Sequence, residues 1–183
     1  MVDLAEIQAA YYMVAATGVL VAAAYYLTTL RNNANTKKIE LSTQITQRLS
    51  SKDKLRDFIE LADLEWKTVE NFRAKYDSKI NPESYAKRWA MWIEYDDLGY
   101  LLRNGVIDRK ILFNNQGNGA TVMWAKFKPI IDDIRRREMG PRFLEHFEYL
   151  AKEMWAMSRD RGYVSPSYRD NLVFDSFRGV YEK

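Results

Sequence analysis

The sequence predicts an all-α protein with a single N-terminal transmembrane helix followed by a small helical bundle. Residues 7–30 carry no charged side chain, whereas all 28 lysines and arginines follow residue 30. In the remainder, apolar residues recur at three- and four-residue steps, and no stretch alternates apolar with polar residues as a half-buried strand would. A length of 183 residues with no cysteine suits one compact domain without disulfides.

The uncharged segment, residues 7–30, is long enough to cross a bilayer. At about 1.5 Å per residue, a helix of this length exceeds a hydrocarbon core of about 30 Å. Tyr11 and Tyr12 lie near one end and Tyr25 and Tyr26 near the other, and tyrosine rings favour the two headgroup levels. We therefore predict a membrane anchor with a tyrosine pair at each interface.

A cleavable signal peptide is the alternative interpretation of this segment. Such a peptide has a basic leader, a shorter apolar core and a small-residue cleavage site. Here the leader carries only the acids Asp3 and Glu6, and the core is longer. These differences favour a retained anchor.

Basic residues flank only the C-terminal end of the anchor. Because basic residues close to a span resist translocation, they predict that the N-terminus is outside and the soluble domain cytoplasmic. Arg31 is expected at the cytoplasmic membrane interface. The residues that set this orientation are Arg31, Lys37, Lys38 and Arg48.

Small residues lie on one side of the anchor. Gly18 and Ala22 form a small-xxx-small pair, and Ala15 adds low-profile surface, so a partner helix can pack closely there. Alanine-rich spans are also common without a partner, and that alternative stays open. No acidic or basic residue within the segment suggests an ion or proton path.

The chain divides into four parts by composition. Residues 1–31 are the anchor, residues 32–52 a juxtamembrane helix, residues 53–160 the helical bundle, and residues 161–183 a C-terminal extension. The extension contains helix-breaking Gly and Pro residues but is too apolar for a solvated tail, so it needs a surface on its own bundle or on a neighbouring subunit. The residues that we expect to form a partner surface are Tyr168, Phe174, Phe177 and Tyr181.

Helix signals divide the bundle further. Residues 52–76 keep one apolar face at helical spacing, which predicts a single helix. Asn81-Pro82 supplies an N-cap and a first-turn proline for the next helix, which we expect to stop near Gly105. Asp108 is expected to cap a short helix.

Two further helices are predicted after that short one. We expect the short helix to end at about Phe113 and residues 114–119 to form a loop, because this stretch is rich in Asn and Gly. A longer helix follows and ends at Gly140, and Pro141 begins the last helix.

The residue inventory argues against the common catalytic and metal sites. A di-iron bundle needs repeated Glu-x-x-His pairs and a zinc site several His or Cys residues, but the chain has one histidine, His146, and no cysteine. We therefore predict no catalytic, cofactor or metal residues and no enzyme activity. His146 is expected at the boundary of an amphipathic helix, and Gly117–Gly119 in a connector rather than a phosphate cradle.

Charged clusters have a structural interpretation beside a functional one. Adjacent acids at Asp96-Asp97 and Asp132-Asp133 point about 100° apart on a helix, so we expect them to be solvated or paired with arginine. Arg135, Arg136 and Arg137 form the densest basic patch, which either meets a lipid headgroup or an acidic partner or pairs with the neighbouring acids. The five tryptophans are expected in the core.

Residues 89–108 carry a pattern of tryptophan, glycine and leucine positions that reads W-x2-W-x-EY-x2-LG-x-LLR-x-G-x-ID. Together with Trp124, Pro129 and the Phe143-x3-Phe147 motif, this pattern resembles an uncharacterised family of bacterial and archaeal proteins with one N-terminal transmembrane helix and a Trp-rich helical domain. The likeness covers roughly residues 5–155. It implies this architecture and no established activity.

These observations predict a non-catalytic accessory or structural subunit of a larger membrane complex, held by the lipid bilayer and by other membrane-protein subunits. A membrane oxidoreductase or monooxygenase-type assembly is an example of such a host, although no residue selects it. The alternative is a membrane-anchored sensor or defence protein that recruits a soluble partner through its helical domain. Because the net charge of +3 is spread over many surfaces, we expect no nucleic-acid partner, and we expect no small-molecule substrate.

Overall fold

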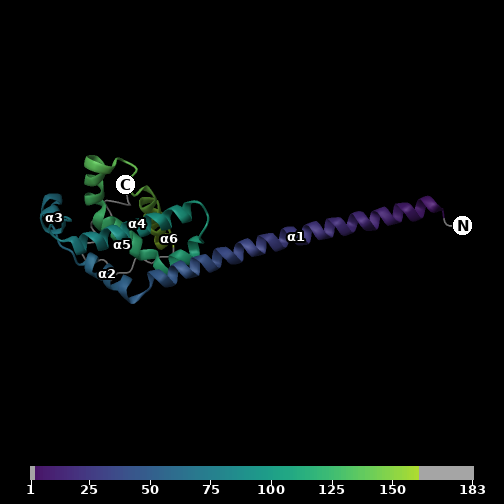
Figure 1. The fold of residues 1–183 in the computed structure, drawn as a ribbon, viewed down its shortest axis with the longest axis horizontal. Coiled ribbons are helices and arrows are strands. Elements are labelled where there is room, and N and C mark those ends of the chain that lie inside the picture. Colours follow the sequence, from purple (N-terminus) through teal and green to yellow (C-terminus); the bar gives the residue numbers. More distant parts are fainter. Residues whose placement is uncertain (1–2, 161–183) are drawn as a thin grey trace. The chain divides into compact units, whose positions relative to one another are not determined.

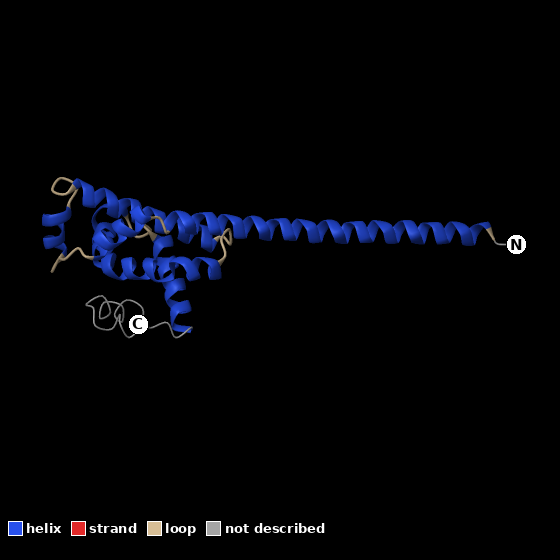
Figure 2. Cartoon of the chain, turned by 90° about the horizontal axis from the view of Figure 1, so that it is seen from below, coloured by secondary structure: helices blue, strands red, loops and turns tan. Residues whose placement is uncertain are grey.

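The fold is all-α, as predicted. The computed structural model describes residues 3–160, without the side chains of residues 46 and 115–118. Within that part no strand is present (Figure 2). The helices are α1 (Leu4–Leu49), α2 (Lys52–Ala62), α3 (Val69–Tyr76), α4 (Pro82–Arg103), α5 (Arg109–Ile134), the π-helical turn η1 (Arg135–Met139) and α6 (Glu145–Asp160) (Figure 1).

The chain forms two compact units, residues 1–40 and residues 41–183. The first contains most of α1. The second, called the helical domain below, contains the end of α1 and the other helices. Within the helical domain, α6 packs against both α4 and α5, and α2 and α3 also contact these two helices. The core therefore lies around α4, α5 and α6.

The last turns of α1 belong to the helical domain. Leu41, Ile45 and Leu49 pack against its core, and Ser42 is buried. The Ser42 hydroxyl accepts a hydrogen bond from the backbone N–H of Asp108 at 3.1 Å. The predicted continuation of the helix beyond the uncharged segment is confirmed.

Helix α4 begins and ends where its sequence signals indicate. The Asn81 side chain accepts a hydrogen bond from the Ser84 backbone N–H at 3.0 Å, and Pro82 is the first helical residue. Gly105 follows the helix with φ +68°, a backbone conformation that favours glycine. Asp108 then caps α5 as predicted, because its carboxylate accepts the backbone N–H groups of Lys110 and Ile111.

Close packing of α4 on α6 depends on Gly99. A Cβ atom at this position would overlap the backbone carbonyl of His146 on α6. Tyr95 of α4 and Phe147 of α6 stack beside this contact, with ring centroids 5.0 Å apart. Because Gly99 has no side chain, α4 and α6 can approach closely enough for the Tyr95 and Phe147 rings to stack.

Two of the five tryptophans are fully buried, and the other three lie at the edge of the core. Trp92 and Trp124 are at most 1% exposed, as predicted for core residues. Partly buried tryptophans pack around the same clusters, and these are Trp66, Trp89 and Trp155.

The prediction of a single helix over residues 52–76 was wrong. Helix α2 ends at Ala62, and Thr68 caps a separate helix, α3, by accepting the backbone N–H of Asn71 at 3.1 Å. Between them Trp66 stacks on the Phe127 ring with centroids 5.3 Å apart. The apolar spacing runs through the break because residues on both sides of it face the same core.

The predicted loop at residues 114–119 was also wrong, because α5 runs through it without interruption. Gly119 lies where a Cβ would be 2.9 Å from the Tyr95 hydroxyl oxygen and 3.5 Å from the Phe58 ring. A residue without a side chain is therefore favoured here by packing rather than by a turn. Tertiary contacts outweigh the poor helix propensity of glycine here.

The last helix starts later than predicted. Gly140 ends the preceding turn with φ +79°, but α6 begins at Glu145 rather than Pro141. One oxygen of Asp96 on α4 accepts the backbone N–H groups of His146 and Phe147 at 3.0 and 2.9 Å. The expectation that Asp96 is solvated or paired with arginine was therefore wrong, since this carboxylate caps the start of α6.

Candidate membrane anchor and interaction surfaces

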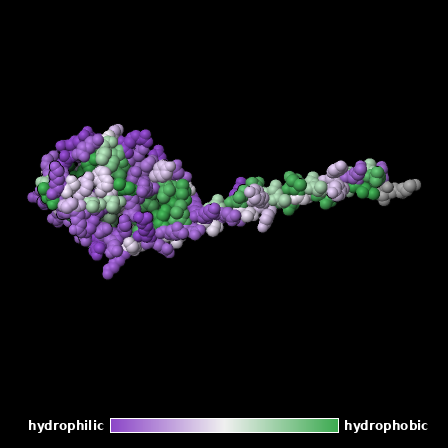
Figure 3. Space-filling view, viewed as in Figure 1, coloured by the Kyte–Doolittle hydropathy of each residue, from purple (hydrophilic) through white to green (hydrophobic). Residues whose placement is uncertain are grey.

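The N-terminal part of α1 is apolar on every side. Val14, Val19 and Leu20 are 73%, 69% and 70% exposed, and at about 100° per residue these side chains point in three different directions. Figure 3 shows apolar residues recurring along this part of the chain, whereas hydrophilic residues dominate the visible face of the helical domain. Within the described residues, α1 is the one helix long and apolar enough to cross a membrane.

The threonine hydroxyl groups within this segment donate hydrogen bonds to its own backbone. Each of three threonines donates to the carbonyl four residues earlier, at 2.8 to 2.9 Å, and these are Thr17, Thr28 and Thr29. No bond to another element is needed, which suits a helix in hydrocarbon.

The tyrosines predicted at the membrane interfaces all have exposed rings. Tyr11 and Tyr12 meet edge to face with centroids 6.2 Å apart, and Tyr25 and Tyr26 are 74% and 63% exposed. Arg31 is exposed one residue beyond the uncharged segment. Their assignment to headgroup levels stays a prediction.

The residues predicted to pack against a partner helix share one face of α1. Ala15, Gly18 and Ala22 are all exposed, and a Cβ built at Gly18 meets no atom within 4 Å. The helix is therefore free to accept a neighbour there, and the partner itself stays a prediction. The residues predicted to form a second partner surface lie outside the described part of the chain, and these are Tyr168, Phe174, Phe177 and Tyr181.

His146 lies at the boundary between the buried and exposed faces of α6, as predicted. Its side chain is 23% exposed, and its ring meets Tyr100 edge to face with centroids 5.3 Å apart. Among the described residues, Nδ1 has no hydrogen-bond partner, and the nearest carboxylate oxygen, on Glu145, is 4.0 Å from Nε2. These contacts do not assemble a base with a nucleophile.

The three consecutive arginines at residues 135–137 form ion pairs with nearby acidic side chains. Asp133 is 4% exposed, and its carboxylate lies 2.6 Å from Arg73, 3.6 Å from Arg136 and 2.9 Å from Arg137. Arg135 lies 2.8 Å from a Glu148 oxygen. The structural interpretation of this cluster is confirmed, and the buried acid also ties α3 to the end of α5.

The sequence did not indicate that Arg88 is buried. Its guanidinium lies 4.7 Å from the Phe72 ring centroid, 5.1 Å from that of Tyr85 and 5.3 Å from that of Trp92. One nitrogen donates to the Tyr76 carbonyl at 3.3 Å. Burial lowers the pKa of Arg88 to about 10, and the ring faces partly offset this cost. Arg88 precedes Trp92 by four residues, so the two share one face of α4, and this spacing was the sequence signal that could have indicated its burial.

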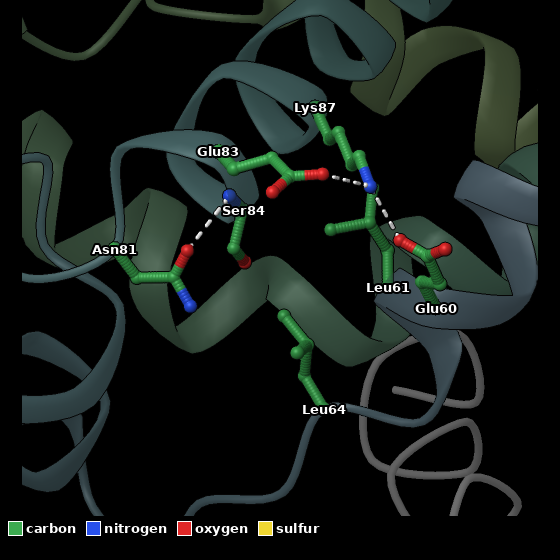
Figure 4. A pocket seen from close by; sticks show the side chains of 7 residues that line it. All are labelled: Glu60, Leu61, Leu64, Asn81, Glu83, Ser84 and Lys87. Carbon is green, nitrogen blue, oxygen red and sulfur yellow. Dashed lines mark hydrogen bonds and ion pairs between the residues drawn. The ribbon is translucent and has the colours of Figure 1, made fainter.

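A small cavity of about 220 Å³ lies between the end of α2 and the start of α4 (Figure 4). Lys87 points to two carboxylates at its rim, with Nζ 2.6 Å from Glu60 and 2.8 Å from Glu83. These hydrogen bonds raise the pKa of Lys87. Leu61 and Leu64 form the apolar side. Both rim carboxylates are therefore paired with the same lysine.

No group of three or more metal-ligating side chains occurs among the described residues. Two features therefore stand out in this part of the chain. The N-terminal part of α1 is apolar and exposed on every side, and many charged side chains of the helical domain form ion pairs.

Comparison with known proteins identifies a family without an assigned function. Residues 12–155 match a domain of unknown function, DUF4760. No curated protein and no solved structure shows significant similarity to the chain. The match begins inside the uncharged segment and continues through the packing residues of α6, so it covers most of the chain. The chain therefore belongs to the DUF4760 family.

Proposed function

We propose that the chain is a single-pass membrane protein and a non-catalytic accessory or structural subunit of a larger membrane complex. The N-terminus lies outside and the helical domain in the cytoplasm. The observation that carries the proposal is the all-round apolar surface of residues 7–30. Moving one such Val or Leu side chain out of water is favourable by about 1.5–3 kcal/mol of free energy. A hydrocarbon surrounding removes these side chains from water on every side of the helix.

Sequence features support both the partner contact and the orientation in this proposal. Ala15, Gly18 and Ala22 give one side of the helix a low profile, and close helix contacts in membranes use such faces. Basic residues after the segment, beginning with Arg31, support the cytoplasmic orientation. Other membrane-protein subunits are the expected partners, and the apolar composition of residues 161–183 favours a second contact with them.

Site-specific photocrosslinking in native membranes tests the partner face. A photoreactive residue at Ala15, Gly18 or Ala22 should give discrete crosslinked bands with multi-span proteins. The matched controls are Met13 and Leu20, which point to the opposite side of the helix at about 100° per residue. Equal crosslinking from both faces, or none from either, would contradict a packed partner helix.

Substitution of the small residues gives the complementary test. Gly18→Leu should lower the recovery of partners in mild detergent, because the larger side chain blocks helix approach. Among the described residues, no atom lies within 4 Å of a Cβ built at Gly18, so we expect the fold of the helical domain to be unaffected. Leu20→Ala is the control and should leave recovery unchanged. A stable monomer by native mass measurement of the unmodified protein would overturn the proposal.

A second candidate function is recruitment of a soluble partner by a membrane-anchored sensor or defence protein. The supporting observation is an apolar ridge on α2, where Leu55 and Ile59 are 57% and 50% exposed and lie four residues apart. Leu55→Glu with Ile59→Glu should then abolish capture of a soluble protein and leave membrane partners bound. Ile80→Glu, at another exposed isoleucine, is the control.

A further inference from the structure

The connection between α4 and α5, residues 100–111, has the surface of a membrane-contact site. We propose that this corner of the helical domain, called the α4–α5 corner below, rests on the headgroups of an anionic bilayer. The inference depends on the proposed membrane anchor. It adds a second lipid contact, made by the domain itself.

Apolar and basic side chains are mixed on the α4–α5 corner. Tyr100 is 52% and Val106 39% exposed, and Ile111 is half-buried. Arg103 and Lys110 are exposed beside them. An aromatic ring, aliphatic side chains and basic groups together are the composition that settles at a bilayer surface.

The turn that carries Val106 is held firmly and has few polar groups to desolvate. Backbone hydrogen bonds join Gly105 N–H to the Leu102 carbonyl at 3.0 Å and Val106 N–H to the Leu101 carbonyl at 2.9 Å. Ile107, the next residue, is 2% exposed and fixes the turn to the core. Val106 is therefore presented outward on a pre-formed tip.

The charge on the α4–α5 corner complements anionic lipid. The Asp108 carboxylate is used as the cap of α5, and Arg109 pairs with Glu153 at 3.1 Å. In the described part of the chain, neither Arg103 nor Lys110 forms a close ion pair with a carboxylate, and Arg103 acts on Glu145 only through a weaker attraction that helps to lower the pKa of that carboxyl. Arg103 instead lies 5.7 Å from the centroid of the Tyr149 ring. Two basic groups thus stay available to phosphate oxygens.

The length of the chain keeps the α4–α5 corner close to the proposed anchor. The corner is bonded to Ser42 through the Asp108 N–H, and only residues 31–41 separate Ser42 from the end of the uncharged segment. These residues span about 18 Å as the helix that they form and at most about 40 Å if extended. A surface held within that reach meets the bilayer at high effective concentration.

The opposite end of α4 provides a matched comparison. The connection before Pro82 presents Ile80, which is 64% exposed, next to Lys79. It has a similar mix of side chains but lies at the other end of a helix about 33 Å long, far from the bond to Ser42. Only the α4–α5 corner should touch lipid.

Single-cysteine labelling of the full-length protein in nanodiscs tests the proposal, and the chain has no cysteine to remove. A fluorophore is attached at Val106→Cys, Ile80→Cys or Val14→Cys, and its quenching by doxyl-labelled lipid is measured. The nanodiscs contain phosphatidylcholine alone or with phosphatidylserine. Unchanged tryptophan emission verifies the fold of each variant.

We expect quenching at Val14→Cys in both lipids, quenching at Val106→Cys only with phosphatidylserine, and none at Ile80→Cys. Adding Arg103→Glu and Lys110→Glu should weaken the contact of Val106→Cys at least about fivefold, the effect of one basic group near an anionic surface.

Three results would overturn the proposal. Quenching at Val14→Cys without quenching at Val106→Cys would refute the lipid contact and leave the anchor intact. Equal quenching at Val106→Cys in both lipids would refute selection for anionic headgroups. Absence of quenching at Val14→Cys would refute the proposed function together with this inference.

Discussion

Helix α6 and the uncharged part of α1 place similar apolar side chains in opposite environments. In α6 the apolar residues share one face, and Phe147, Leu150 and Met154 are at most 1% exposed. In α1 the side chains of Val14 and Leu20 are at least 70% exposed. A single apolar face is typical of a helix that packs on a protein core, whereas apolar side chains on every side are typical of a helix that crosses a membrane.

Arginine substitutions in the anchor should have the largest effect, which is loss of membrane binding. They test directly whether lipid covers the uncharged part of α1. Val14→Arg combined with Leu20→Arg should release the protein from membranes, because each arginine at the centre of a span costs about 2.5–3.5 kcal/mol. Retention in the pellet after alkaline carbonate extraction is the measurement. Ile80→Arg is the control and should stay membrane-bound, and full retention of the double variant would show that lipid does not cover this helix.

Crowding the contact between α4 and α6 should strongly destabilise the helical domain. Gly99→Ala places a Cβ against the His146 carbonyl and should cost about 3 kcal/mol, because backbone must shift. All five tryptophans follow residue 65, so thermal unfolding followed by tryptophan fluorescence reports on this domain alone. Gly18→Ala, which meets no neighbouring atom, should leave the transition unchanged.

Loss of the cap on α6 should have a moderate effect. Asp96→Ala leaves the His146 and Phe147 N–H groups without their acceptor and should lower the free energy of unfolding by about 1 kcal/mol. Asp97→Ala, at the exposed neighbouring position, should be close to neutral in chemical denaturation. Equal losses in both variants would mean that Asp96 does not cap the helix.

The smallest effect concerns the acid dependence of stability. Burial alone would raise the pKa of Glu148, but hydrogen bonds from Lys152 and Arg135 lower it below the ordinary 4.5. This carboxylate therefore stabilises the fold above pH 4.5, and the contribution is lost as the pH falls through the lower folded-state pKa.

Replacing Glu148 should flatten that acid response. Glu148→Gln should cost about 0.5 kcal/mol at neutral pH and should reduce the drop in melting temperature on acidification below pH 4.5. Glu65→Gln is the control, because among the described residues Glu65 has no side-chain ion pair. An unchanged acid profile for Glu148→Gln would contradict the lowered pKa.

Local chemistry made several boundaries predictable from sequence. Asn81 and Asp108 each cap a helix through side-chain bonds to residues two or three positions away, and Gly105 supplies the left-handed stop. Such signals act within one turn and can be recognised without knowing the rest of the fold. The uncharged segment was equally evident, because its length and lack of charge need no tertiary information.

Features that depend on distant residues were not predictable. The break before Thr68 and the helical path through Gly119 reflect the rings of Phe127 and Tyr95, which belong to other helices. The capping role of Asp96 likewise requires α6 to lie beside α4. Spacing in the sequence indicates which residues share one face of a helix, but it does not indicate which helix packs against that face.

The core residues at the end of α1 limit where the chain can be cut without unfolding the domain. Leu41, Ile45 and Leu49 pack against the core, whereas residues 31–37 are exposed. We expect proteolysis within residues 31–37 to release the helical domain intact. Cleavage after Leu49 would strip three apolar side chains from that domain and leave a fragment prone to aggregation.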